Sequence, residues 1–296
     1  MIVKRQSIYP HILSYMICLF FLTPANAAIS KEAPADSKTI TIKGSTTILP
    51  IAQIMAEEFM DKNKDISISV QGGGSGVGIA SLIDKTADIA DSSRKISPKE
   101  LEQAKGSGVT PYENIIAMDG IAVVVHPSNI KNHFNTHQLR AVYTGKVSNW
   151  LEIGGENRKI VVISRDTSSG TYEAFANLAL SGQKVRPDAL ITASNQTVNT
   201  TVAQTPGAIG YLGLGYVSKK VKAVRINNIE CTKDTIRSGK YPLSRPLYMY
   251  TDGIPEGTVR RFIDYILSGQ GQELVETEGF VGIRIQVYKN PDRDDK

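Results

Sequence analysis

Strand-like patterns in this chain repeatedly end in a turn rich in glycine, serine and threonine, and a helical pattern begins directly after the turn. The first such turn, Gly44–Thr47, lies between an alternating run at 39–43 and a helical period at 48–60. The second, Gly72–Gly76, joins a strand pattern at 66–70 to another helical pattern. Repeated strand, turn and helix is typical of an open sheet covered by helices. This alternation therefore predicts an α/β fold.

Two further polar turns complete a set of four that could surround one ligand. Ser92-Ser93-Arg94 follows a short strand pattern at 87–90, and Arg165–Thr171 follows an apolar strand pattern at 160–163. Ligands of open α/β sheets bind beyond the carboxyl ends of strands, which is where these turns fall. Each helix N-terminus offers unpaired N–H groups and about half a positive charge. Together the turns predict a pocket for a small tetrahedral oxyanion, bound without a metal.

A second α/β region begins near residue 121. The continuous apolar run Ile121–Val125 predicts a buried strand. Before this region, Ser97 followed by Pro98 predicts the start of a helix at Pro98. Further strands are expected at 160–163, 207–211 and 247–250, and further helices at 139–143, 172–180, 259–267 and 272–278. The chain shows no internal repeat and no low-complexity tract.

The first 27 residues have the pattern of a signal peptide. Lys4 and Arg5 form a basic start, and an apolar run follows at 12–22. Ala25–Ala27 has the small-x-small form of a cleavage site, which predicts cleavage before Ala28. The apolar run is shorter than a membrane-spanning helix requires.

Two other interpretations of this start remain open: an uncleaved anchor, and a lipoprotein modified at Cys18. The second is disfavoured because the apolar run continues beyond that cysteine. After cleavage, Cys231 is the remaining cysteine, so the exported chain can form no internal disulfide. Cleavage also lowers the formal charge from +5 to about +3, a mild balance without the Lys/Arg runs typical of nucleic-acid binding.

The order and spacing of these turns resemble those of the periplasmic phosphate-binding proteins of the ABC phosphate-uptake system. The resemblance runs from about residue 39 to 285. The motifs that carry it are Lys43–Thr47 with Pro50, Gln71–Gly76, Ala87–Ile89 before Ser92–Arg94, Tyr143–Lys146 before Asn149-Trp150, Arg165 with Ser169–Thr171, and Pro206–Tyr211.

The resemblance implies a two-lobed periplasmic-binding-protein fold of the Venus-flytrap type. Each lobe would be an open mixed sheet flanked by helices, and ligand would bind in the cleft as the lobes close about a hinge. The implied organisation is a signal peptide at 1–27, a flexible lead-in at 28–38, a first lobe at 39–120 plus 246–285, a second lobe at 121–245 and a polar tail at 286–296. The chain would then cross between lobes near Gly120-Ile121 and near Leu243–Arg245.

The resemblance also implies a set of ligand contacts drawn from all four turns. They are Thr46, Thr47, Ser75, Gly76, Ser93, Arg94, Arg165, Ser169, Gly170 and Thr171. Glycines let the backbone approach the ligand closely, hydroxyls donate or accept, and an arginine clamps two oxygens at once. For Arg94, a salt bridge on the surface or between the lobes explains the residue equally well.

One departure from the family pattern concerns the third turn. Many members have a carboxylate there that accepts the proton of hydrogen phosphate, and such an acceptor repels sulfate. Ser93 occupies this place here, which leaves Asp91 and Asp166 as candidate acceptors. Discrimination between phosphate and sulfate therefore stays open, and sulfate, molybdate or tungstate is the alternative ligand.

We therefore predict an exported, monomeric phosphate-binding protein of the periplasm that delivers its ligand to a membrane ABC permease. It should need no cofactor and no metal, bind no nucleic acid and catalyse no reaction. Two alternatives come from other classes: a serine hydrolase using Ser75 or Ser169, for which no His–Asp pair is placed, and a surface scaffold that has lost its ligand. His126, His133 and His137 do not form a convincing set of metal ligands.

Overall fold

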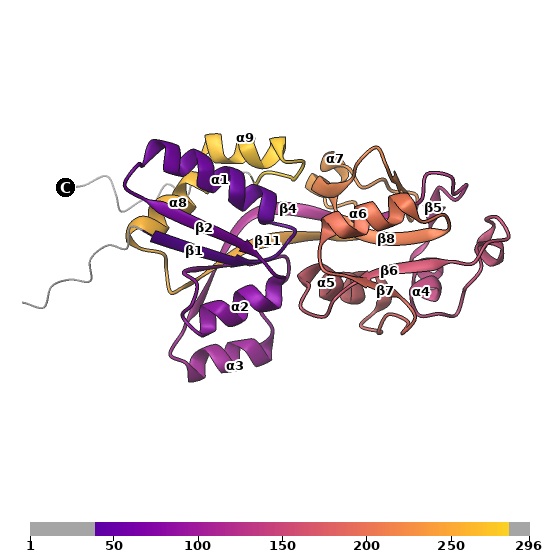
Figure 1. Ribbon diagram of the computed structural model, residues 1–296, viewed down its shortest axis with the longest axis horizontal. Coiled ribbons are helices and arrows are strands. Elements are labelled where there is room, and N and C mark those ends of the chain that lie inside the picture. Colours follow the sequence, from indigo (N-terminus) through magenta and orange to yellow (C-terminus); the bar gives the residue numbers. More distant parts are fainter. Residues whose placement is uncertain (1–38, 284–296) are drawn as a thin grey trace, which may run out of the picture. The chain divides into compact units, whose positions relative to one another are not determined.

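A nine-stranded sheet runs through the part of the chain that the computed structural model describes, residues 39–283, and helices cover both of its faces (Figure 1). Its strands are β1 (Thr39–Gly44), β2 (Ser67–Gly72), β3 (Ile89–Ser92), β4 (Pro111–Val125), β6 (Val161–Arg165), β7 (Leu190–Thr192), β8 (Ala208–Gly213), β9 (Lys222–Ala223) and β11 (Ser244–Asp252). Their order is β2-β1-β3-β11-β4-β8-β6-β7, with β9 paired to β4. A separate small sheet joins β5 (His133–Phe134) and β10 (Arg225–Ile226). The mixed α/β class predicted from the alternating patterns is confirmed.

The helices begin at the turns that the sequence pattern indicated. They are α1 (Leu49–Lys62), α2 (Ser75–Ile83), α3 (Pro98–Gly106), α4 (Thr136–Tyr143), α5 (Gly170–Leu180), α6 (Asn195–Gln204), α7 (Lys233–Arg237), α8 (Gly257–Leu267) and α9 (Gly269–Thr277), with 3-10 turns η1 (Trp150–Ile153) and η2 (Leu214–Tyr216). The predicted start of α3 is confirmed, because the Ser97 side chain accepts a hydrogen bond from the Glu100 N–H in a capping box. Helix α6 was not predicted, since its polar and β-branched sequence carries little apolar periodicity.

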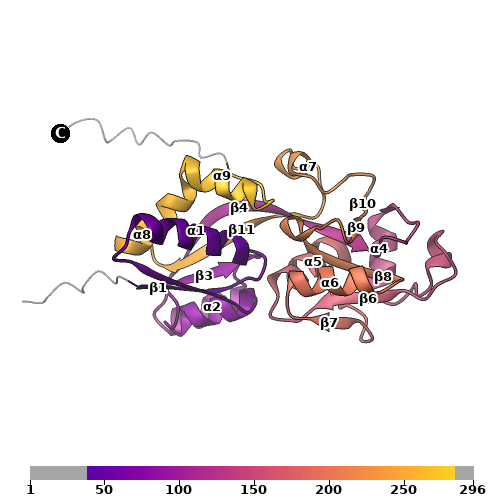
Figure 2. The ribbon, with the colours of Figure 1, turned by 45° about the horizontal axis from the view of Figure 1, so that its top comes forward.

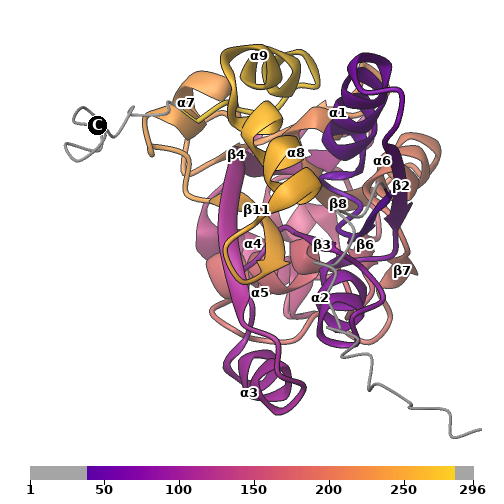
Figure 3. The same cartoon turned by 90° about the vertical axis from the view of Figure 1, so that its left-hand side faces the viewer.

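The first lobe is built on β2, β1, β3 and β11. Helices α1, α8 and α9 lie on one face of these strands, and α2 and α3 lie on the other (Figures 1 and 3). Alternate residues of β1, Ile40 and Ile42, face the first group of helices and are fully buried. This packing positions the N-termini of α1 and α2 at the carboxyl ends of parallel strands.

The second lobe is built on β8, β6 and β7. Helix α6 covers one face of these strands, through Val198 and Val202, whereas α4 and α5 cover the other (Figure 2). On the α4 and α5 side, Phe175 stacks on Tyr211 with ring centroids 4.0 Å apart. The Tyr211 hydroxyl in turn accepts a hydrogen bond from the Arg165 N–H, so this aromatic core holds the end of β6 in place.

Strands β4 and β11 pass from one lobe to the other. Up to Gly120, β4 pairs with β11, and from Ile121 onward it pairs with β8. Strand β4 therefore changes its pairing partner between Gly120 and Ile121. All described residues belong to one compact unit, and the lobe boundaries 39–120 with 246–285 and 121–245 remain a prediction. The expected signal peptide at 1–27, lead-in at 28–38 and tail at 286–296 lie outside the described residues.

Candidate anion site between the two lobes

Side chains of the first and second lobes meet at the predicted turns. The Thr47 and Thr171 hydroxyl oxygens lie 2.9 Å apart, and both residues are almost fully buried. Beside them, the Gly76 N–H donates to the Ser168 carbonyl at 2.9 Å, and the Ser168 hydroxyl oxygen lies 3.1 Å from the Gly73 carbonyl oxygen. These contacts bring the N-termini of α1, α2 and α5 together, so that their helix dipoles converge on one place.

The glycine and serine turns fit together with little space to spare. The Ser93 N–H donates to the Ser75 hydroxyl at 3.0 Å, and the two hydroxyl oxygens are 3.4 Å apart. A Cβ atom added at Gly170 would lie 2.2 Å from the Ser75 Oγ and 2.8 Å from the Ser93 Oγ. Glycine at the start of α5 therefore permits the close approach of the two lobes. Ser169, the residue before it, caps α5 by accepting from the Tyr172 N–H.

Arg165 is a buried cation with one unsatisfied donor. Its side chain is 1% exposed, its Nε donates to the Thr192 carbonyl at 3.2 Å, and its Nη2 donates to the Ala193 carbonyl at 3.0 Å. Its Nη1 has no hydrogen-bond partner. Burial lowers the pKa of Arg165; the Asp166 charge opposes this effect, and the nearby Arg245 charge adds to it. A bound anion would supply the missing partner and offset the repulsion between the two guanidinium groups.

Sequence reasoning missed three polar residues behind this site: Asp119, Arg245 and Asn195. Arg245 forms a buried ion pair with Asp119 at 2.9 Å and donates to the Thr171 hydroxyl at 2.9 Å. Asn195 donates from its amide to the Thr47 hydroxyl at 3.0 Å. Asp119 is a single charge within an otherwise apolar strand pattern, and this could have indicated a buried ion pair. No local sequence pattern distinguishes Asn195.

Arg94 also lies at this junction, and its part in the predicted ligand set stays a prediction. Its guanidinium binds Glu100 at 2.7 Å and Glu173 at 2.6 Å, so two carboxylates already occupy it. Because Glu173 belongs to α5 and Arg94 follows β3, this is the salt bridge between the lobes that the sequence left as the alternative. The remaining members of the predicted set lie at the junction: Thr46, Thr47, Ser75, Gly76, Ser93, Arg165, Ser169, Gly170 and Thr171.

We predict that Glu173→Gln weakens anion binding no more than about fivefold, because exposed ion pairs contribute about 0.2–1 kcal/mol. The Glu173 side chain is 41% exposed, so solvent screens the pair. Calorimetric titration at low and high salt checks this, with the difference from wild type shrinking as salt is added. Glu156→Gln, which removes an ion pair to Arg158 on the second lobe, is the matched control. A loss much larger than fivefold would mean that Arg94 acts on the ligand directly.

The two carboxylates considered as proton acceptors differ in their surroundings. Asp166 Oδ1 accepts from the Ser168 N–H at 3.0 Å and from the Ser168 hydroxyl, and therefore stabilises its own turn. Asp91 is 2% exposed, and its Oδ1 has no partner. Burial raises the pKa of Asp91 well above its ordinary value.

The raised pKa of Asp91 predicts a pH-dependent effect of Asp91→Asn. A carboxyl whose folded-state pKa is raised stabilises the fold below its ordinary pKa and loses that contribution as pH rises toward the raised value. The variant, which does not titrate, should therefore unfold at a higher temperature than wild type at about pH 8, and the gain should disappear toward about pH 3. Thermal unfolding at both pH values measures this. If the difference in unfolding temperature between the variant and wild type were the same at both pH values, the pKa of Asp91 would not change between the folded and unfolded states.

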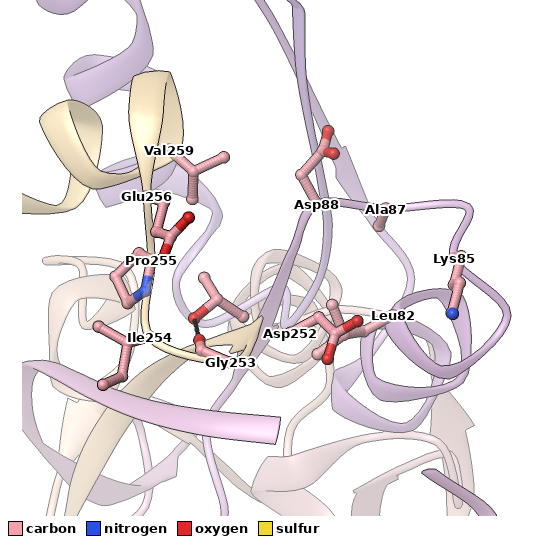
Figure 4. Close-up of a pocket in the computed structure, with 11 residues that line it drawn as sticks. Leu82, Lys85, Ala87, Asp88, Asp252, Gly253, Ile254, Pro255, Glu256 and Val259 are labelled. Atoms are coloured by element: carbon pink, nitrogen blue, oxygen red, sulfur yellow. Dashed lines mark hydrogen bonds between the residues drawn. The ribbon is translucent and has the colours of Figure 1, made fainter. Parts of the chain in front are cut away.

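A separate hollow of about 680 Å³ lies in the first lobe, away from these turns (Figure 4). It is lined by Leu82, Lys85, Ala87, Asp88, Thr251, Asp252, Gly253, Ile254, Pro255, Glu256 and Val259. Two of its carboxylates accept hydrogen bonds from backbone groups. Asp88 accepts from the Thr41 N–H, and Asp252 accepts from the Thr110 N–H. Across residues 39–283, no group of three His, Cys, Asp or Glu side chains could hold a metal ion, and no helix combines the length and apolarity to span a membrane.

Comparison with known proteins places this geometry in context. A family model described as "PBP superfamily domain" matches residues 30–270. The chain is 32% identical to the phosphate-binding protein PstS of Bacillus subtilis over 285 residues, covering 92% of this chain and 93% of the relative. It is also 32% identical to PstS of Borreliella burgdorferi over 281 residues, covering 91% and 99%.

Solved structures of similar proteins have the same two-lobed fold. One is a putative phosphate ABC transporter substrate-binding protein from Clostridium perfringens with bound phosphate, with a TM-score of 0.77 at 32% identity, covering 83% of this chain and all of that one. Another is an ABC-type phosphate transport receptor from Vibrio cholerae, with a TM-score of 0.70 at 32% identity, covering 82% of this chain and all of that one. The two-lobed fold implied by the sequence resemblance is confirmed.

Proposed function

This chain belongs to the PBP superfamily and, within it, to the phosphate-binding proteins of the PstS type, and we propose from this that it captures inorganic phosphate between its two lobes. The proposed contacts are the nine residues named above at the junction, from Thr46 to Thr171 without Arg94, and Arg165 is the charged clamp among them. The protein would then deliver phosphate to an ABC permease from outside the cytoplasmic membrane, in the periplasm, as a monomer and without catalysis.

The single observation that carries this proposal is the unpaired Nη1 of Arg165. A buried N–H without a partner costs about 1–3 kcal/mol, and more on a charged group. The neighbouring Thr47 and Thr171 hydroxyls and the helix N-termini offer further donors and no negative charge. A compact anion with several oxygens satisfies such a set, because each oxygen can accept from a different element.

Isothermal titration of the wild-type protein with inorganic phosphate tests the proposal. We expect saturable binding at one site per chain with micromolar or tighter affinity. Absence of heat with phosphate at micromolar protein concentration, together with the absence of any shift in unfolding temperature, would reject the proposed function.

A second candidate ligand is another tetrahedral oxyanion, and one observation favours it. Ser93, rather than a carboxylate, lies against the Ser75 hydroxyl, so this turn offers no full negative charge to repel sulfate. Competition of sulfate, molybdate and tungstate against phosphate separates the two candidates. Tighter binding of one of those anions than of phosphate would replace phosphate as the ligand.

The contacts of the two candidate nucleophiles do not favour a hydrolase. The Ser75 hydroxyl accepts from the Ser93 N–H and the Ser169 hydroxyl caps α5, so both have structural partners. Within residues 39–283 the hydrogen-bond partners of these two hydroxyls include no histidine, and a serine nucleophile needs an adjacent base.

A further inference from the structure

The Arg165 side chain is held in place by the second lobe alone. Its Nε donates to the Thr192 carbonyl and its Nη2 to the Ala193 carbonyl, while its backbone N–H donates to the Tyr211 hydroxyl at 3.2 Å. All three partners belong to the second lobe, so none of these bonds depends on contact with the first lobe. The unpaired Nη1 is therefore a donor that is already positioned when the lobes are apart.

Two threonine hydroxyls of the first lobe, in contrast, are held by side chains of the second lobe. The Asn195 amide donates to the Thr46 hydroxyl at 3.3 Å and to the Thr47 hydroxyl at 3.0 Å, and the Thr171 hydroxyl oxygen lies 2.9 Å from that of Thr47. The Arg245 Nη2, on the crossing strand β11, is 3.4 Å from the Thr47 oxygen, and both of its hydrogens have closer partners at 2.9 Å. When the lobes separate, these two hydroxyls therefore lose the side chains that position them.

The two lobes also carry formal charges of opposite sign. Residues 121–245 contain 16 Lys and Arg against seven Asp and Glu, a formal charge of +9, whereas residues 39–120 and 246–283 together contain 10 against 17, a formal charge of −7. Arg94, the cation of the first lobe at the junction, is already paired with Glu100 of its own lobe. An anion that approaches the open protein is therefore attracted by the second lobe and repelled by the first.

We propose, resting on the proposed function, that phosphate binds first to the second lobe, on Arg165, and that the first lobe then closes over it. Thr46 and Thr47 meet the anion only in the closed protein, where the second lobe positions their hydroxyls. Arg165 therefore controls how fast phosphate is captured. Thr46 and Thr47 control how slowly it leaves, because the closed complex must open before the anion dissociates.

The rate constants of phosphate association and dissociation, measured by stopped-flow protein fluorescence, test this order. Arg165→Met should lower the association rate constant about thirtyfold or more and change the dissociation rate constant by about threefold or less, since fewer captured complexes are available to close. Thr47→Val keeps the shape of the side chain and removes its hydroxyl. It should raise the dissociation rate constant about tenfold and leave the association rate constant within about twofold of wild type.

Thr144→Val is the matched control, because the Thr144 hydroxyl donates to the Arg140 carbonyl at the end of α4, outside the site. Both of its rate constants should equal those of wild type. If Thr47→Val does not fold, Thr46→Val removes the other hydroxyl that Asn195 contacts, and it should likewise raise the dissociation rate constant alone.

Two pairs of exposed lysines near the junction test the role of charge, one pair from each lobe. Lys219 and Lys220 belong to the second lobe, and Lys220 lines the same hollow as Tyr216, whose hydroxyl donates across the junction to the first lobe. Lys95 and Lys99 belong to the first lobe, directly after its third turn. At an ionic strength of about 0.01 M, replacing both second-lobe lysines with glutamine should slow association about threefold, and replacing both first-lobe lysines should slow it clearly less. Both effects should disappear at about 1 M, where the Debye length falls from about 30 Å to about 3 Å.

Any other division of these effects would overturn the inference and leave the proposed function intact, because phosphate would still bind. Examples are an Arg165→Met variant that acts mainly on dissociation, a Thr47→Val variant that acts mainly on association, or equal effects of the two lysine pairs. If the wild-type protein itself binds no phosphate, the proposed function fails and this inference fails with it.

Discussion

Replacing Arg165 with methionine should weaken phosphate binding by about a hundredfold or more, while the ligand-free protein unfolds at an unchanged or slightly higher temperature. Breaking a buried charge pair costs about 2–5 kcal/mol, and each 1.4 kcal/mol is about a factor of ten in affinity. Without ligand, the substitution removes an unpaired N–H and the repulsion from Arg245, which compensates for the two lost bonds to carbonyl groups.

Calorimetric titration and thermal unfolding of the same preparation measure both parts of this prediction. Arg186→Met is the matched control, because Arg186 also lies in the second lobe, is largely buried and binds a carboxylate and a carbonyl group. The control should bind phosphate as wild type does. A parallel fall in affinity and in unfolding temperature for the Arg165 variant would assign that residue a structural role.

Gly170→Ala should reduce phosphate affinity by about a hundredfold by preventing the two lobes from meeting. The added Cβ would lie 2.2 Å from the Ser75 Oγ and 2.9 Å from the Ser75 Cβ, closer than atoms pack. Overpacking of this kind costs about 1–3 kcal/mol, and it acts only where the lobes are in contact. The ligand-free protein should therefore keep its stability, since alanine is favourable in the first turn of a helix.

Small-angle scattering with and without phosphate detects the loss of closure directly. Wild type should become more compact when phosphate is added, whereas Gly170→Ala should change little. Gly106→Ala at the end of α3 is the control, because a Cβ there meets no atom within 4 Å. Wild-type affinity in the Gly170 variant would show that the lobes bind phosphate without this close contact.

The two expected effects differ in their physical origin. Arg165 provides charge to the ligand, so its loss acts on binding even in a fully closed protein. Gly170 provides only space, so its replacement acts on closure even if every ligand contact is intact. Measuring affinity and compaction together therefore separates recognition of the anion from the motion of the lobes.

Much of the arrangement around the site was predictable from local sequence. The turns at Gly44–Thr47, Gly72–Gly76 and Arg165–Thr171 each follow a strand and precede a helix, and parallel strands bring their carboxyl ends to one edge. The hydroxyls of Thr47 and Thr171, which are 124 residues apart in the chain, accordingly lie 2.9 Å from each other. Local patterns were informative here because strand and helix periods depend on near neighbours.

Other features depended on contacts that no local pattern encodes. The two carboxylates that bind the Arg94 guanidinium, Glu100 and Glu173, lie 6 and 79 residues away in the chain, and the second belongs to the other lobe. The strand pattern at Ile121–Val125 is correct, but β4 extends back to Pro111, because its first half is only partly apolar and pairs with β11. Pairing with a distant strand stabilises such a segment whatever its own periodicity.

Residue patterns along the chain were sufficient to predict that polar turns rich in N–H and hydroxyl groups gather at one edge of an α/β sheet. Which buried side chains contact those groups became apparent only in the folded molecule. Asn195 comes from an unpredicted helix and donates to the Thr47 hydroxyl, and Arg245 comes from the returning strand β11 and donates to the Thr171 hydroxyl. Hydrogen-bond direction depends on every partner of an oxygen at once, and those partners are brought together only by the fold.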